Sequence, residues 1–175
     1  VGTWVGEIGR LMTTRNFIVT DAGGQRIAAA STLWAMIDVK TRQPLDLRDN
    51  VDYSRALLAI PCPIDKPAKI GRIEGVPCDS RRVRYSDIDF NQHTNSMKYI
   101  QWMLDALPLE KLTGCRMKRL DVNFVHETRY GQQLVVCCEY GTDRDRFEIR
   151  FEDGTAACKA AIRWETSDER SNQTA

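Results

Sequence analysis

The chain has 175 residues, 42% of them apolar and 28% charged, with 25 basic and 24 acidic side chains and a formal net charge of +1 at pH 7. No uncharged apolar run reaches the roughly 18 residues that a membrane-spanning helix needs. A charge so close to zero argues against a nucleic-acid binder and against a polybasic membrane anchor. The sequence therefore predicts a soluble globular chain of one domain, or of one domain and part of another.

The chain has six cysteines, and no two of them have the C-x-x-C spacing of redox and metal motifs. Cys137 and Cys138 are adjacent on a predicted strand, so their side chains should point to opposite faces. We interpret all six as reduced thiols. The chain opens with no signal peptide, which predicts the cytoplasm, although Val1 is not an initiator methionine.

The first part of the chain consists of short runs rich in β-branched and aromatic residues, at 4–7, 16–20 and 26–38, with a hairpin turn at 21–24. Five of the six prolines then lie between residues 44 and 77, which is typical of a linker. A similar series of predicted strands follows, with its turn at 152–154. These strands lie at 81–85, 116–125, 133–140, 146–151 and 156–164.

The two series of strands match when the sequence is shifted against itself by 130 residues. The matched pairs are Val5 and Val135, Phe17 and Phe147, Val19 and Ile149, Gly24 and Gly154, Ala30 and Ala160, and Trp34 and Trp164. A shared turn glycine and a shared tryptophan at the end of a strand, without gaps, favour an internal repeat. The alternative is two unrelated antiparallel hairpins.

One long helix is predicted over 96–107, with Asn95 as its N-cap and Pro108 at its end. Met97, Ile100, Met103, Leu104 and Leu107 recur at intervals of three and four, so one face should be buried. A strand, a buried helix and then several antiparallel strands predict an α+β fold, with a sheet wrapped around a central helix.

The loop that leads into this helix, at 84–95, contains two carboxylates, carboxamides and an imidazole. Asp89 or His93 could take a proton from a water molecule, and the free N–H groups at the helix start could stabilise an oxyanion. The alternative is that Asp87, Asn91 and Asn95 are ordinary turn and cap residues.

The segment SDIDFNQHTN at 86–95, followed by Lys98, Tyr99, Ile100 and Trp102, resembles the signature of the acyl-ACP thioesterases (ACP, acyl carrier protein). These are double hot-dog enzymes of plants and bacteria. The first part of the chain agrees with the resemblance, through TWV at 3–5, RNF at 15–17 and STLWAM at 31–36.

The resemblance implies a tandem hot-dog fold. Residues 1–43 would be the last strands of a partial first hot-dog, 44–78 a proline-rich linker, 79–165 a complete second hot-dog that carries the catalytic residues, and 166–175 a disordered tail. A first hot-dog without its front strands and helix would expose apolar surface and a sheet edge. We therefore expect reduced stability or self-association, a homodimer included.

The family's functional positions carry over residue by residue. The resemblance implies that Asp89, Asn91, His93 and Glu127 are the catalytic residues, and that Asn95, Tyr99 and Trp102 contact the substrate. From the sequence alone, a carboxylate such as Glu127 near a strand end is more often simply exposed to solvent. The cysteine that follows this glutamate in many plant members is here Thr128, which favours direct attack by water over a covalent thiol mechanism.

The implied partner is acyl carrier protein with its phosphopantetheine-linked acyl chain. Carrier proteins are acidic, so the basic cluster Arg116, Lys118 and Arg119 could attract one. A second basic cluster lies at Arg81, Arg82 and Arg84, and the alternative for both is a solvated surface balanced by acids. Only two histidines occur, His93 and His126, and we predict no metal and no cofactor.

The predicted function is hydrolysis of acyl-ACP to free fatty acid and carrier protein. Three alternatives remain open: a hot-dog thioesterase acting on coenzyme A esters, a non-catalytic acyl-binding module, and, less favoured, a dehydratase of the same fold. The sequence does not reveal the acyl-chain length or which residue is the base.

Overall fold

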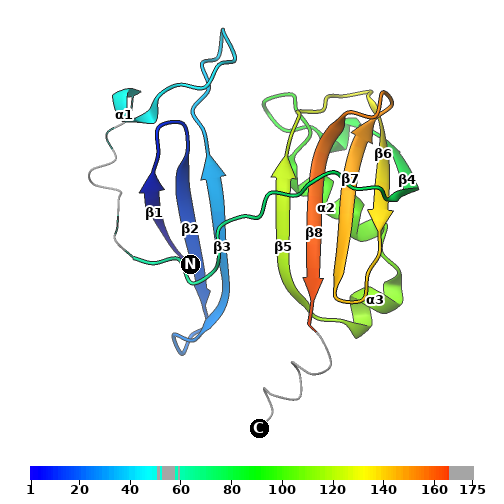
Figure 1. The fold of residues 1–175 in the computed structure, drawn as a ribbon, viewed down its shortest axis with the longest axis horizontal. Coiled ribbons are helices and arrows are strands. Elements are labelled where there is room, and N and C mark those ends of the chain that lie inside the picture. The colour runs from blue at the N-terminus through cyan, green and yellow to red at the C-terminus, as the bar shows by residue number, and fades with distance from the viewer. Residues whose placement is uncertain (51, 53–57, 59, 166–175) are drawn as a thin grey trace. The chain divides into compact units, whose positions relative to one another are not determined.

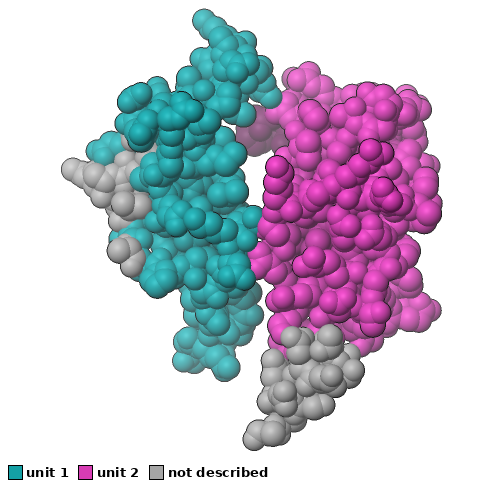
Figure 2. Space-filling model, viewed as in Figure 1, with its two compact units in different colours: residues 1–67 teal, residues 68–175 magenta. Residues whose placement is uncertain are grey.

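A computed structural model describes residues 1–50, 52, 58 and 60–165, so the predicted tail at 166–175 lies outside the described residues. The chain divides into two compact units, Val1–Pro67 and Ala68–Ala175 (Figure 2). In the described part, no helix is long and apolar enough to cross a membrane.

The first unit contains a three-stranded antiparallel sheet, in the order β1-β2-β3 (Figure 1). Its strands are β1 (Gly2–Ile8), β2 (Thr13–Thr20) and β3 (Arg26–Trp34), followed by the single-turn helix α1 (Leu47–Asn50). The three predicted strands are confirmed, although β3 ends at Trp34 rather than at Asp38. The indole Nε1 of Trp4 donates a hydrogen bond to the Ile60 carbonyl at 2.9 Å, which ties the later segment to β1.

The second unit is a five-stranded antiparallel sheet, in the order β4-β6-β7-β8-β5, with a long helix against it (Figure 1). The strands are β4 (Val76–Arg82), β5 (Met117–Phe124), β6 (Gln133–Glu139), β7 (Arg144–Phe151) and β8 (Ala156–Trp164). The helices are a 3-10 turn (Tyr85–Asp87), α2 (Ser96–Asp105) and α3 (Leu109–Gly114). This is the predicted sheet around a central helix.

The core of the second unit lies between α2 and the inner face of the sheet. Helix α2 contributes Tyr99, Trp102 and Met103, each at most 4% exposed. Met97, which the helical spacing placed on the buried face, is 63% exposed. The prediction for Met97 was wrong because the buried face of α2 is centred on its aromatic residues. That face is rotated by about one residue from the face that the aliphatic residues define. The sheet contributes Leu134, Val136, Cys138, Phe147, Ile149, Cys158, Ala160, Ile162 and Trp164.

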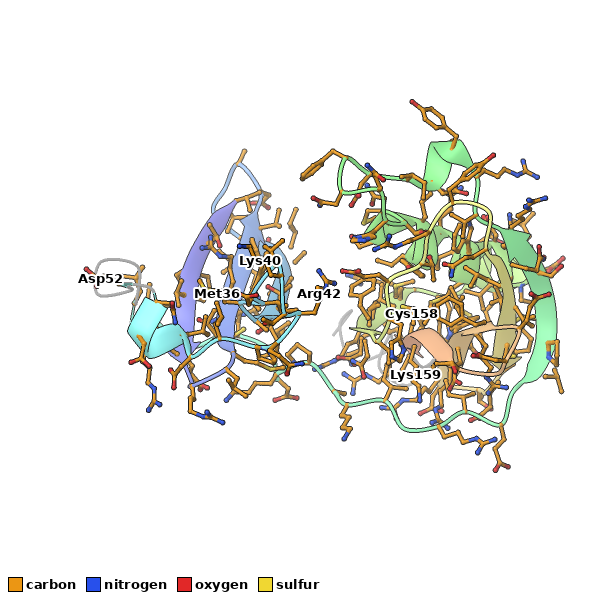
Figure 3. The ribbon with its side chains drawn as sticks, turned by 90° about the horizontal axis from the view of Figure 1, so that it is seen from above. Met36, Lys40, Arg42, Asp52, Cys158 and Lys159 are labelled. Atoms are coloured by element: carbon orange, nitrogen blue, oxygen red, sulfur yellow. A yellow bond between two sulfur atoms is a disulfide. The ribbon has the colours of Figure 1, made fainter. Side chains whose placement is uncertain are left out.

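The outer face of the same sheet is covered by the extended segment 68–74, which we call the strap; its path across the strands is visible in Figure 1. Successive side chains of β8 point to opposite faces of the sheet, as Cys158 and Lys159 show (Figure 3). Cys158 lies in the core, whereas Lys159 Nζ donates a hydrogen bond to the Gly71 carbonyl at 3.3 Å. Ile73 of the strap is fully buried. Part of the predicted linker is therefore bound to the sheet.

Polar side chains of the sheet satisfy the backbone of the strap. Asn123 of β5 accepts from the Ile70 N–H at 2.8 Å and donates to the Ala68 carbonyl at 3.0 Å. Glu148 of β7 accepts from the Ile73 N–H at 3.3 Å, and the Arg150 guanidinium donates to the Ile73 carbonyl. These bonds explain why an extended segment without strand partners can lie on this face.

The structure agrees with the predicted repeat over one hairpin of each series, β2–β3 in the first and β7–β8 in the second. Phe17 pairs with Ala30 and Phe147 with Ala160, and both hairpins have a bulge at the same place, after Val19 and after Ile149. Their turn glycines have the same left-handed backbone, with φ of 85° at Gly24 and 83° at Gly154.

The repeat does not extend without a gap to the preceding strand. Phe17 pairs with Thr3, whereas Phe147 pairs with Cys138, so β1 corresponds to β6 with a shift of 135 residues (138 − 3). The match of Val5 with Val135 was therefore wrong. The register of each pair is set by its own connecting turn, and these two turns differ.

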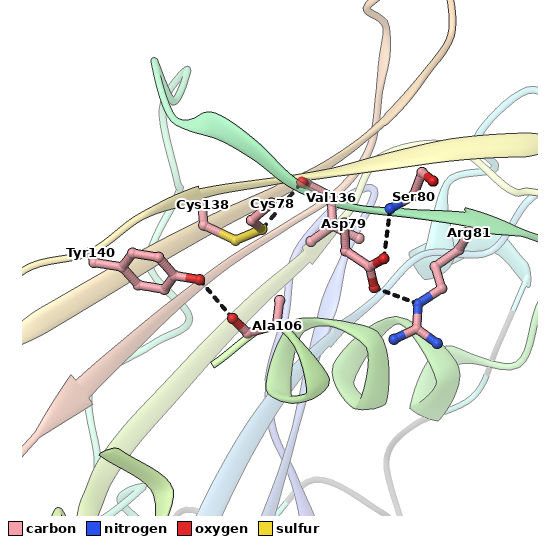
Figure 4. The surroundings of a disulfide bond; sticks show 8 residues. All are labelled: Cys78, Asp79, Ser80, Arg81, Ala106, Val136, Cys138 and Tyr140. Carbon is pink, nitrogen blue, oxygen red and sulfur yellow. Dashed lines mark hydrogen bonds and ion pairs between the residues drawn. A yellow bond between two sulfur atoms is a disulfide. The ribbon is translucent and has the colours of Figure 1, made fainter. Parts of the chain in front are cut away.

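Strand β4 begins at Val76, inside the segment predicted as linker, and includes Pro77. It is an edge strand, where a missing proline N–H is tolerated. Cys78 forms a disulfide with Cys138 of β6, with Cα atoms 6.0 Å apart (Figure 4). The interpretation of all six cysteines as reduced thiols was therefore wrong, because pairing across 60 residues of sequence depends on a sheet register that spacing does not reveal.

Candidate active site

The loop between the 3-10 turn and α2 is organised around Asp89. Its Oδ1 accepts hydrogen bonds from the N–H groups of Asn91 at 2.9 Å and His93 at 3.3 Å, and its own N–H donates to the His93 carbonyl at 2.9 Å. Gln92, at the centre of this loop, has a positive φ of 64°. This left-handed backbone conformation is energetically unfavourable for any residue that has a side chain. Asp89 therefore holds the loop in a conformation that it would not adopt alone.

The side chains of His93 and Glu127 meet although 34 residues separate them in sequence. His93 Nε2 lies 3.2 Å from Glu127 Oε2, with side-chain exposures of 21% and 46%. Glu127 follows β5, so the contact joins the loop before α2 to the end of that strand. The glutamate that the family resemblance implied is thus next to the predicted histidine.

A buried cluster of hydroxyl groups joins the segments that carry His93 and Glu127. Thr128 is fully buried, and its hydroxyl donates to Thr94 Oγ1 at 2.6 Å and accepts from the Tyr99 hydroxyl at 2.7 Å. The Thr94 N–H also donates to the Thr128 carbonyl at 2.8 Å. Burial raises the pKa of Tyr99, which keeps its hydroxyl protonated. Thr128 is therefore an anchor for the neighbouring Glu127, and its own side chain is not exposed at the surface.

The first turn of α2 offers few free donors. The Asn95 side chain caps the helix by accepting from the Met97 N–H at 2.9 Å, and the Asn95 carbonyl accepts from the Lys98 N–H at 2.9 Å. The Asn95 N–H donates to the Asp87 carbonyl at 2.8 Å. Three of the four N–H groups at 95–98 thus have acceptors, so the expectation that helix amides form an oxyanion site has little support here.

The other predicted site residues lie in different surroundings. Asn91 is exposed at the loop surface, and Asn95 uses its side chain in the helix cap. Tyr99 and Trp102 are buried in the core, with ring centroids 5.7 Å apart. The structure brings together His93 and Glu127 by their side chains, and Asp89, Asn91 and His93 by the loop backbone.

Two sequence profiles match the chain. The profile of the acyl-ACP thioesterase N-terminal domain matches residues 1–53, and that of the acyl-ACP thioesterase C-terminal domain matches residues 74–166, which is more than half of the chain. The chain belongs to the acyl-ACP thioesterase family. The predicted resemblance and the hot-dog fold are confirmed.

Known acyl-ACP thioesterases show how much of the family architecture the chain covers. An acyl-ACP thioesterase structure from Bacteroides thetaiotaomicron is 33% identical, with a TM-score of 0.86 over 93% of this chain and 67% of that one. The 12:0-ACP thioesterase from Umbellularia californica shares the fold at 20% identity, with a TM-score of 0.75 over 93% of this chain and 64% of that one. The chloroplastic palmitoyl-acyl carrier protein thioesterase of Cuphea hookeriana is 28% identical over 94% of this chain and 43% of its own length. The chain thus spans less than half of this curated relative.

Both predicted basic clusters contain arginines that pair with acidic side chains. Arg119 makes two hydrogen bonds of 2.8 Å to the Asp121 carboxylate, and Arg116 lies 3.8 Å from Glu165 with 72% of its side chain exposed. In the other cluster, Arg81 pairs with Asp79 at 2.6 Å (Figure 4).

The second cluster borders a groove of about 450 Å³ between β4 and α2. Its lining includes Arg82, Arg84 and Lys98. Both arginines are exposed, and within the described residues their guanidinium groups have no ion pair. This groove therefore has an excess of positive charge.

The described cysteines near the core are poor nucleophiles. Burial raises the pKa of the Cys158 thiol to about 12 and also raises that of Cys137. Within the described residues, no three histidine, cysteine, aspartate or glutamate side chains cluster as a metal site would require.

Sequence reasoning missed two parts of the site: the hydroxyl cluster and Arg129, whose Nη2 lies 3.2 Å from His93 Nε2. The position of Arg129, two residues after Glu127, was the one available signal for it.

Proposed function

We propose that the protein hydrolyses acyl-ACP, releasing a free fatty acid and the carrier protein. The observation that carries the proposal is the contact of His93 with Glu127, in a chain of the acyl-ACP thioesterase family. The family resemblance had named both residues as catalytic, and the fold brings them together from separate elements. The relatives named above support the carrier-linked substrate by their own names.

In the proposed mechanism, Asp89 and the His93–Glu127 pair orient and deprotonate a water molecule, and Asn91 helps position the reacting groups. The water oxygen bonds to the thioester carbonyl carbon, the carbon–sulfur bond breaks, and the thiolate leaves. A thiol has a pKa of ~8.5, so it departs without a strong general acid. Direct attack by water is supported by the burial of Thr128, which stands where many plant members have a cysteine.

The substrate contacts are also a proposal. Asn95 stands at the exposed start of α2, whereas Tyr99 and Trp102 are buried, so we propose that these two shape the wall of the acyl site from within the core. Each methylene buried in such a site contributes about 0.8 kcal/mol, which allows chain length to be measured.

For the carrier protein we propose the cluster of Arg116, Lys118 and Arg119 as a docking surface, with acidic side chains of the carrier as its counterpart. Charge reversal there should raise KM for acyl-ACP in a salt-dependent way. The same reversal at Arg82 and Arg84 tests the groove. An unchanged KM after either reversal would remove that cluster from the proposal.

The deciding experiment measures free fatty acid release from a panel of acyl-ACP substrates, with the same acyl groups on coenzyme A in parallel. Asp89→Asn and Glu127→Gln are the test variants, and Glu139→Gln, a carboxylate paired with Arg146 on the sheet, is the matched control. Release that prefers the carrier and falls at least 100-fold in both test variants, as loss of acid–base catalysis predicts, supports the proposal. Preference for coenzyme A, or acyl binding without turnover, would favour the alternative functions.

A further inference from the structure

His93 Nε2 has two polar neighbours of opposite kind at the same distance. Glu127 Oε2 lies 3.2 Å away, and Arg129 Nη2 also lies 3.2 Å away. A carboxylate only accepts hydrogen bonds, whereas a guanidinium is always protonated and only donates them. One imidazole nitrogen therefore cannot satisfy both neighbours at once.

The two contacts belong to two states of the ring. When Nε2 is unprotonated, it can accept from Arg129, and the ring proton is then on Nδ1. When Nε2 carries a proton, it can donate to Glu127, and the contact with Arg129 is lost. The proton on Nε2 thus decides which partner binds.

Arg129 is placed for this role by its backbone. Its N–H donates to Gln132 Oε1 at 2.6 Å, its carbonyl accepts from the Gln132 N–H at 3.2 Å, and the preceding Thr128 is anchored in the hydroxyl cluster. Within the described residues, its guanidinium has no ion pair with a carboxylate, and its hydrogen bond is to His93. Ordinary ion pairing therefore does not explain where this side chain lies.

We propose that Arg129 is a positioning residue that holds resting His93 as the Nδ1–H tautomer, with Nε2 open to take a proton. The inference rests on the proposed function and adds an order of events. As the water oxygen bonds to the carbonyl carbon, its proton passes to Nε2. The hydrogen bond from Arg129 then breaks, and Nε2–H donates to Glu127. The proton later leaves Nε2 for the departing thiolate sulfur, and Arg129 binds again.

The tautomer of each histidine can be observed in the full chain by 15N NMR of the imidazole ring. The chain has only two histidines, and the second is an internal reference. His126 Nδ1 lies 2.9 Å from the Ala156 carbonyl, which only accepts, so His126 must carry a proton on Nδ1. Spectra are recorded over a series of rising pH values, and the tautomers are read where the ring signals no longer change with pH.

Arg129→Met removes the donor and retains most of the side-chain length. We expect His93 to shift toward the Nε2–H tautomer, because Glu127 then accepts without competition, while the His126 signals stay unchanged. We expect kcat for acyl-ACP to fall about tenfold or more with little change in KM. Arg129→Lys, which keeps a cationic donor, should retain the Nδ1–H tautomer. Arg163→Met, at an exposed arginine of β8, is the matched control and should change neither readout.

An unchanged His93 tautomer in Arg129→Met would overturn the inference, even if the protein hydrolyses acyl-ACP. A shifted tautomer in a protein whose wild type releases no fatty acid would support the role of Arg129 at His93 and refute the proposed function. The two proposals can therefore fail separately.

Discussion

The β2–β3 hairpin and the β7–β8 hairpin share their backbone geometry and differ in their surroundings. Both have the same register, a bulge at the same place and a glycine turn with nearly the same φ. Trp164 at the end of β8 is 3% exposed, whereas Trp34 at the end of β3 is 55% exposed. Local sequence thus determines the hairpin, and the elements that cover it determine how much stability each side chain contributes.

The outer faces of the two hairpins differ in charge. Glu148 of β7 corresponds to Ile18 of β2 (148 − 130), and Arg150 corresponds to Thr20. Only the second hairpin has charged side chains that bind the backbone of the strap. The repeat therefore conserves backbone geometry while the side chains adapt to what covers each sheet.

The largest expected contrast is between the two tryptophans. Trp164→Ala removes a buried indole whose Nε1 donates to Asp145 at 2.6 Å, so we expect a loss of about 3–5 kcal/mol in the free energy of unfolding. Trp34→Ala should cost less than ~1 kcal/mol because its side chain is mostly in water. Hydrogen exchange of amides in each unit measures both losses. Equal costs would mean that burial does not separate the hairpins.

The disulfide gives the next contrast, because β6 carries Cys138 where β1 carries Thr3. Cys78→Ser opens a link across 60 residues and should lower stability by about 2–4 kcal/mol. Chemical reduction of the wild type should have the same effect, and Cys62→Ser is the control at a free cysteine.

A thiol count in denaturant without reductant checks the bond itself. Four thiols are expected from Cys62, Cys115, Cys137 and Cys158. Six would restore the interpretation of reduced cysteines. The prediction of the cytoplasm rested partly on that interpretation, and four thiols would weigh against it, because disulfides are rare in reducing compartments.

The features that sequence predicted well are local ones. The strands, the turn glycines Gly24 and Gly154, and the Asn95 cap each depend on residues within a few positions of one another. The offset of 130 holds for β2–β3 and β7–β8 because a short hairpin fixes its own register. It fails for β1 because a different turn sets that pairing.

The features that sequence missed depend on distant contacts. Spacing alone could not bring Glu127 to His93, and the family resemblance supplied that pair. Cys78 reaches Cys138 because β4 pairs with β6, and Thr128 reaches Tyr99 because the segment after β5 packs against α2. Likewise, the role of the polar residues of β7 can be recognised only from the strap that they bind.

Lowering the pH should weaken the charged contacts on the outer face of the second sheet. Burial alone would raise the pKa of Glu148, but the hydrogen bond from Arg150, together with the charges of Arg150 and Lys159 and the Ile73 N–H, holds it below its usual range. A lowered pKa means that Glu148 stabilises the fold at neutral pH and that this contribution is lost as the pH falls through the carboxylate range.

Glu148→Gln should therefore lower stability by about 2 kcal/mol at pH 7 and by progressively less as the pH falls through the lowered pKa of Glu148. Denaturant unfolding at a series of pH values measures this. Glu139→Gln, at a half-exposed carboxylate paired with Arg146, is the control and should change stability by less than ~1 kcal/mol. A pH-independent loss in Glu148→Gln would show that the strap is held by shape rather than by charge.

The smallest effects should fall on the feature that the two hairpins share. Gly24 and Gly154 have φ near +84°, a conformation that strains any residue with a Cβ, and neither has a heavy atom within 4 Å of where that Cβ would be. Gly24→Ala and Gly154→Ala should each cost about 1 kcal/mol, because the strain is local and independent of burial. Gly114→Ala, at the end of α3 with open space around it, is the control and should be neutral or slightly stabilising.

Equal costs at the two turns, measured by hydrogen exchange in each unit, would mean that backbone geometry is repeated independently of the core. A clearly larger cost at Gly154 would mean that the buried hairpin transmits turn strain into its packing.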